Sequence, residues 1–78
     1  MDEILKDSIY YRISSKGDFG VKYNLTPDGF EVSLVDVSGE ISANRHFYDF
    51  ITSVKFFEKL CIYCVRNQFE ETYNILVH

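Results

Sequence analysis

The clearest structural signal in this sequence lies at residues 19–34, which read FGVKYNLTPDGFEVSL. Apolar and polar residues alternate over Phe19–Leu25, which is the period-two pattern of a half-buried β-strand. The residues that follow, TPDG, favour a β-turn because proline suits the second position and glycine the last. Alternation then resumes over Phe30–Val37. The stretch therefore predicts two antiparallel strands joined by a tight turn.

A third strand is expected before this hairpin, over Ser8–Ser14, because apolar residues alternate there as well. The residues on its apolar face are Ile9, Tyr11 and Ile13. Residues 15–18 (SKGD) form a turn in which Gly17 can adopt a positive φ. Because short turns join the three strands, we predict a three-stranded antiparallel meander.

The pattern changes after residue 40, where apolar residues begin to recur at spacings of three and four, which indicates an amphipathic helix. These residues are Phe47, Phe50, Ile51, Val54, Phe57, Cys61, Cys64 and Val65. We expect one unbroken helix over residues 43–66, with Ser42 or Asn44 as its N-cap. Such a helix is about 35 Å long. It would overhang a strand of about 23 Å unless it bends near residues 52–53.

The last segment, residues 67–78, is compatible with two structures. Thr72–Val77 is rich in β-branched residues that alternate, which favours a strand. Asn67 followed by Glu70 resembles a capping box, which favours a helix. We prefer the strand and predict a single α+β domain over residues 1–78 with the order βββαβ, and βββαα as the alternative. For residues 1–7 we expect a loose lead-in rather than a helical turn, since isolated short helices are marginal.

Composition and charge argue against several classes of protein. Apolar residues make up 46% of the 78 residues, so a packed core is expected rather than a disordered chain. The net charge is -4 and the basic residues form no run, which disfavours direct binding to nucleic acid or to a membrane surface. No stretch is apolar enough to span a bilayer, and the acidic start shows no signal-peptide pattern. We expect a cytoplasmic bacterial or phage protein with reduced cysteines.

Few residues could carry chemistry. Cys61 and Cys64 form a Cys-x-x-Cys motif, but a redox dithiol needs a stabilised thiolate, and these thiols lie deep inside the predicted helix. His46 would lie about 22 Å from Cys61 along a straight helix, too far for a shared zinc ion. His46 and Asp49 could touch, but nothing marks a third group for acid–base catalysis. We expect the cysteines to fill the core and predict no catalytic residue, metal or cofactor.

A second set of apolar residues lies off the main stripe of the predicted helix, namely Tyr48, Phe56, Leu60 and Tyr63. A helix that is apolar on two sides must be covered twice, and large aromatic residues are enriched at the centres of interfaces. A small secondary core with residues 1–7 and 67–78 would explain the same residues. The interface interpretation predicts a non-enzymatic protein-interaction module for an unknown protein partner, or a homodimer through the helix, with Glu58 and Lys59 at the rim.

The acidic balance supports a different hypothesis, a small inhibitor or decoy that blocks a basic nucleic-acid-binding protein. It requires carboxylates that converge on one face, and its binding would weaken steeply with salt. The layout resembles small bacterial open reading frames and phage-borne inhibitor proteins in its short length, acidity and low cysteine content. This resemblance involves the general architecture and no motif, so it implies no role for any residue.

Overall fold

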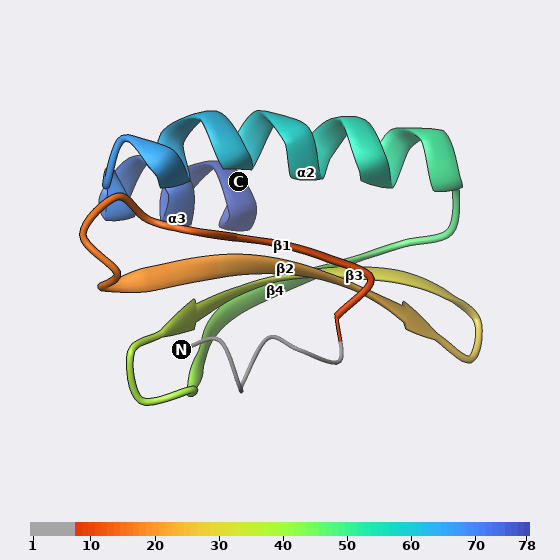
Figure 1. Ribbon diagram of the computed structural model, residues 1–78. Helices are drawn as coiled ribbons and strands as arrows, with labels where there is room; N and C mark the ends of the chain where they lie inside the picture. The colour runs from red at the N-terminus through yellow and green to blue at the C-terminus, as the bar shows by residue number, and fades with distance from the viewer. Residues whose placement is uncertain (1–7) are drawn as a thin grey trace.

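The computed structural model describes residues 8–78, in which two helices cover one face of a four-stranded antiparallel sheet (Figure 1). The strands lie side by side in chain order, from β1 at one edge to β4 at the other. The elements are β1 (Tyr10–Ile13), β2 (Phe19–Thr26), β3 (Gly29–Asp36), β4 (Ile41–Phe47), α2 (Phe50–Val65) and α3 (Phe69–Val77). The expectation for residues 1–7 lies outside the described residues.

The predicted hairpin of β2 and β3 is confirmed. Tyr23 pairs with Val32 across the two strands, and the two-residue turn between Thr26 and Gly29 joins them. Gly29 has a packing reason to lack a side chain, because a Cβ there would collide with the carbonyl oxygen of Phe47. The hairpin thus forms the centre of the sheet, with β1 and β4 added on its two sides.

The expected start of the helix at residue 43 is wrong, because residues 41–47 form the fourth strand, β4. This strand pairs antiparallel with β3, and Phe47 lies opposite Phe30. The pairing gives hydrogen-bond partners to the backbone of β3 that a three-stranded sheet would leave open. Phe47 fits both the helical spacing and the alternation of a strand. A prediction based on the spacing alone therefore began the helix too early. The three-stranded meander with one long helix is therefore corrected to a four-stranded meander with a shorter helix.

The N-cap of α2 is Asp49, not Ser42 or Asn44. Its Oδ2 accepts a hydrogen bond from the Thr52 N–H at 2.7 Å. The helix has 16 residues and is about 24 Å long, close to the length of β2, so the expected overhang does not arise. It ends where Asn67 adopts a φ of 59°, which reverses the chain toward α3.

The preferred strand at the C-terminus is also wrong, and the alternative helix is correct. Thr72 and Leu76 are four residues apart on α3, and both are buried against the rest of the molecule. Phe69 packs edge-on against Phe19 of β2, with ring centroids 5.1 Å apart. The predicted capping box does not form, because Asn67 closes α2 and the N-cap of α3 has no side-chain hydrogen bond. Helical spacing buries one face of this segment, which outweighs its β-branched composition.

The core lies between the sheet and the helices. Its fully buried members include Phe19, Val21, Tyr23, Val32, Leu34, Leu60, Cys64 and Leu76. A buried hydrogen bond of 2.6 Å joins the Tyr23 hydroxyl to Ser53 Oγ and ties α2 to the middle of the sheet. Within residues 8–78, neither helix has the length and apolar character needed to cross a membrane.

Candidate interaction surface

The structure separates the residues predicted for an interface. Leu60 is fully buried in the core, so it is not available to a partner. Tyr48 is 78% exposed in the link between β4 and α2. Phe56 is half-buried, with its ring 5.1 Å from Phe47 and the Arg45 guanidinium 5.2 Å above it. These aromatic residues therefore have different surroundings and do not act as one stripe.

The other three predicted residues lie on two sides of α2. Tyr63 is half-buried and Lys59 is exposed. Because the two residues are four positions apart on the helix, they lie on the same flank. Glu58 is exposed on the opposite flank, which faces β1. The structure thus brings Tyr63 and Lys59 together and places Glu58 elsewhere.

A groove of about 660 Å³ lies between α2 and the edge strand β1. We call it the α2–β1 groove, and its lining residues are Tyr10, Arg12, Val54, Phe57, Glu58, Cys61 and Ile62. Tyr10 is 49% and Ile62 is 50% exposed, although both side chains are large and apolar. The same side of α2 carries Ile51 and Val65, which are 61% and 42% exposed. The groove is therefore the place where the helix presents apolar surface that no described element covers.

The amphipathic pattern of α2 explains how the groove arises. Phe57, Leu60 and Cys64 point into the core, and α2 packs across β1, β2 and β3. Since the helix turns 100° per residue, Val54 and Cys61 lie at the border of this buried face, toward β1. Tyr10 of β1 packs against the rings of Tyr23 and Phe57, at centroid distances of 5.7 and 6.3 Å, and forms the floor.

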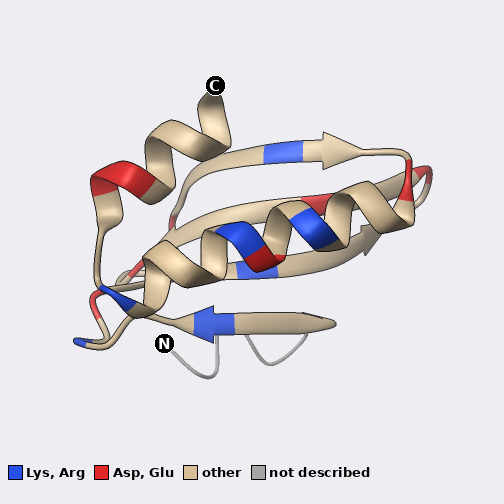
Figure 2. Cartoon of the chain, turned by 90° about the horizontal axis from the view of Figure 1, so that it is seen from above, with Lys and Arg blue, Asp and Glu red and all other residues tan. Residues whose placement is uncertain are grey.

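One basic and one acidic side chain face this groove. Figure 2 shows the basic segment of β1 beside α2, which carries an acidic segment. The two residues are Arg12 and Glu58. In the part of the chain that the structure describes, the one ion pair within 4.0 Å joins His46 and Asp28, so Arg12 and Glu58 have no ionic partner. The groove thus combines apolar walls with two charges of opposite sign that have no ionic partner among the described residues.

The two cysteines are poor nucleophiles. Cys64 lies in the core, as predicted, and its thiol donates to the Arg12 carbonyl oxygen at 3.5 Å. Burial, together with the neighbouring Cys61, raises the pKa of Cys64 to about 11. Burial also raises the pKa of Cys61, although Arg12 opposes this shift. Both thiols are therefore protonated at neutral pH, which does not support thiolate chemistry.

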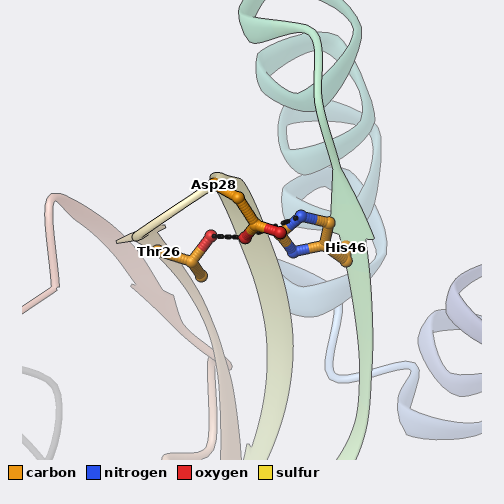
Figure 3. Close-up of polar contacts among 3 residues, drawn as sticks. All are labelled: Thr26, Asp28 and His46. Atoms are coloured by element: carbon orange, nitrogen blue, oxygen red, sulfur yellow. Dashed lines mark hydrogen bonds and ion pairs between the residues drawn. The ribbon is translucent and has the colours of Figure 1, made fainter.

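His46 lies on β4 and not on a helix, so its neighbours differ from the predicted one. Its Nε2 is 3.5 Å from Asp28 Oδ1, and Thr26 Oγ1 donates to the same oxygen at 3.3 Å (Figure 3). Asp49, the expected neighbour, instead caps α2. Because Asp28 is largely exposed, the His46–Asp28 pair is a surface contact that contributes little to stability. It joins the β2–β3 turn to the end of β4.

Within residues 8–78, no group of three or more His, Cys, Asp or Glu residues could hold a metal ion. Comparison with known protein families, with curated proteins and with solved structures finds no match.

The groove was not predicted, because Ile51 and Val65 were assigned to the main apolar stripe of the helix and the second apolar surface was placed on the other flank. Ile51, Ile62 and Val65 are aliphatic residues on one side of α2, and all three are exposed. Their spacing along the sequence already placed them on one side of a helix. The position of β1 beside them could not be predicted from the sequence, since it depends on how the sheet packs under the helix.

Proposed function

We propose that this protein is a non-enzymatic protein-interaction module that binds an extended protein segment in the α2–β1 groove. The observation that carries this proposal is the outer edge of β1, which no strand described in residues 8–78 pairs with, beside the exposed apolar flank of α2. An added strand can pair with such an edge through its backbone and place alternate side chains into the neighbouring groove.

The hydrogen-bond pattern of β1 identifies the groups available for pairing. Arg12 lies opposite Val21, and the Ser14 N–H donates to the Phe19 carbonyl at 2.9 Å. In an antiparallel pair, alternate residues direct both backbone groups toward the partner strand. Residues 12 and 14 therefore face β2, whereas Tyr11 and Ile13 direct their N–H and C=O groups outward. No strand described in residues 8–78 pairs with that side.

The opposite edge of the sheet is less suited to strand addition. β4 pairs with β3 through an irregular register near Leu34 and Val35, and α3 packs across it. Its Arg45 lies over the rings of Phe47 and Phe56, which covers apolar surface with a charged group. Bulges, charges and covering helices are the features by which proteins protect an edge strand. The edge at β1 has the groove instead.

The acidic-decoy hypothesis remains a prediction without a specific supporting observation. In the described residues, the carboxylates are distributed over separate elements (Figure 2). Glu70 and Glu71 lie in the first turn of α3, whereas Asp36 accepts hydrogen bonds in the β3–β4 turn. A decoy would need these groups on one face, so strand binding in the groove has the more specific support.

The proposal can be tested with a displayed library of peptides of about ten residues that alternate apolar and polar positions. Selected peptides should shift the NMR signals of the Tyr11 and Ile13 amides and of the Ile62 methyl groups. Tyr11→Pro removes an outward N–H and should weaken binding at least tenfold while keeping the fold, because proline is tolerated at the open side of an edge strand. Tyr48→Ala is the matched control and should bind normally. Selected peptides that map to another surface, or no binders at all, would contradict the proposal.

A further inference from the structure

We infer that the segment bound in the α2–β1 groove is β1 of a second copy of this chain. This inference rests on the proposed function and names its partner. The two β1 strands pair antiparallel about a twofold axis, so that two four-stranded sheets become one eight-stranded sheet. Three observations on residues 8–78 support a second copy. No described strand pairs with the outer side of β1, that side allows a symmetric register, and Arg12 and Glu58 have no ionic partner among these residues.

The position of α2 leaves suitable space for this arrangement. A twofold axis perpendicular to the sheet makes the neighbouring strands antiparallel and places both pairs of helices on the same face. Because α2 packs across β1, β2 and β3, with β2 in the middle, the axes of the two α2 helices would lie about three strand intervals apart, or about 14 Å. Directly packed helices lie about 8–10 Å apart. The larger distance between the two α2 helices leaves a channel between them, which can hold large side chains from both grooves, such as Tyr10 and Ile62.

The chemistry of β1 selects one register. Tyr10 and Arg12 lie on the helix side of the strand, because they line the groove. Residues opposite one another in adjacent strands share a face, so the symmetric pairing can centre on Tyr11 or on Arg12. Centring on Arg12 would place like charges in contact, which is destabilising. Centring on Tyr11 places Tyr10 of each copy beside Arg12 of the other, which allows two cation–π contacts.

The charges of the groove are self-complementary under the same symmetry. Each copy contributes one Arg12 and one Glu58, and neither has an ionic partner among residues 8–78. In the dimer the two grooves merge, so Arg12 of one copy faces Glu58 of the other, and the contact occurs twice. An unrelated apolar strand would leave both charges without a partner. This complementarity favours a second copy over a generic apolar peptide.

The buried area indicates a reversible dimer. The exposed side chains on this surface are Tyr10, Ile51, Ile62 and Val65, each about half exposed. If each loses about 80 Å², the apolar contribution is on the order of 320 Å² per copy, below the ~800 Å² per partner of a standard interface. We therefore expect a weak, reversible dimer, which sedimentation equilibrium can detect.

Sedimentation equilibrium from 1 µM to 1 mM with a charge swap tests the inference. The wild type should dimerise, whereas Arg12→Glu and Glu58→Arg should each raise the dissociation constant at least tenfold. The double variant Arg12→Glu/Glu58→Arg should recover part of this loss, because each charge regains an opposite partner while the two cation–π contacts of Arg12 stay lost. Lys59→Glu, on α2 but outside the groove, is the matched control and should leave the constant within about threefold. A double variant that stays as weak as the single variants would overturn the inference.

Cross-linking tests the register independently. In a Cys61→Ala/Cys64→Ala background, Tyr11→Cys places two thiols opposite each other at the twofold axis. Cα atoms of a hydrogen-bonded antiparallel pair are about 5.5 Å apart, which suits a disulfide. Oxidation should therefore give a covalent dimer for Tyr11→Cys and little for Ile13→Cys, whose two copies would lie four residues apart. Equal cross-linking of both variants would contradict the Tyr11-centred pairing.

The outcomes distinguish this inference from the proposed function. A wild type that is monomeric at 1 mM, but still binds selected peptides in a manner that Tyr11→Pro abolishes, refutes the dimer and leaves the interaction module in place. A monomer that binds no peptide refutes both. A dimer that ignores both the charge swap and Tyr11→Pro forms through another surface and also overturns the inference.

Discussion

Replacing Ser53 by alanine is expected to destabilise the wild-type protein, but not a variant that already carries Tyr23→Phe. Both side chains lie in the core, with Tyr23 and Ser53 fully buried. The Ser53 hydroxyl has one hydrogen, which it donates to the Phe50 carbonyl at 2.7 Å. Its oxygen is therefore the acceptor for the Tyr23 hydroxyl, 2.6 Å away. Removing Ser53 leaves the tyrosine hydroxyl buried without an acceptor.

The magnitudes follow from this direction of donation. An orphaned buried hydroxyl costs about 1–3 kcal/mol, whereas alanine recovers about 0.5 kcal/mol of helix propensity, so Ser53→Ala should lose about 1.5 kcal/mol. Tyr23→Phe removes the donor and leaves Ser53 bonded to Phe50, which should lose about 1 kcal/mol. Once the tyrosine hydroxyl is absent, Ser53→Ala leaves no buried hydroxyl without an acceptor. Its effect in the Tyr23→Phe background should therefore lie between zero and a gain of about 0.5 kcal/mol.

Urea unfolding of the four proteins at one matched concentration measures this cycle. With a slope of about 1 kcal/mol per molar urea, the wild-type loss corresponds to a midpoint shift of about 1.5 M, which is easily resolved. The same loss lowers the melting temperature by roughly 6–12 °C in a domain of this size. An equal loss on Ser53→Ala in both backgrounds would refute the proposed direction of the hydrogen bond. Tyr48→Phe, at an exposed tyrosine, should leave the midpoint unchanged and serves as the control.

Two further predictions concern ionisable groups. Hydrogen bonds from Thr52 lower the pKa of Asp49 below its ordinary 3.8, so its cap stabilises the fold above that value and is lost as the pH falls through the lowered pKa. Asp49→Ala should therefore lower the urea midpoint at pH 7, and the difference from wild type should shrink in unfolding curves below pH 3; a constant difference would contradict this. For the thiols, a pKa of about 11 leaves about one in a thousand Cys64 side chains ionised at pH 8. In Cys61→Ala the burial that raises the pKa of Cys64 remains, so alkylation of Cys64 should be slow at pH 8 and still accelerate above pH 9, and a plateau near pH 9 would show an ordinary thiol.

The site was only partly accessible to sequence reasoning. A helix with more apolar surface than its sheet covers was predicted from the spacing of its residues, and α2 has such a surface. The prediction placed it on the flank of Phe56 and Tyr63, where β4 and α3 cover part of it. The exposed flank is the other one, with Ile51 and Ile62. Helical spacing orders the residues around an axis, but only packing determines which side meets a neighbour.

The central hairpin and the body of α2 followed from the chain alone, because both depend on interactions between near neighbours. Alternation and a TPDG turn specify β2 and β3, and spacings of three and four specify Phe50–Val65. Segments that fit two periods were decided by tertiary contacts instead. Residues 41–47 became a strand because the edge of β3 offered them backbone partners, and residues 69–77 became a helix because one helical face could be buried. Whichever arrangement satisfies more backbone groups and buries more apolar surface prevails over local preference.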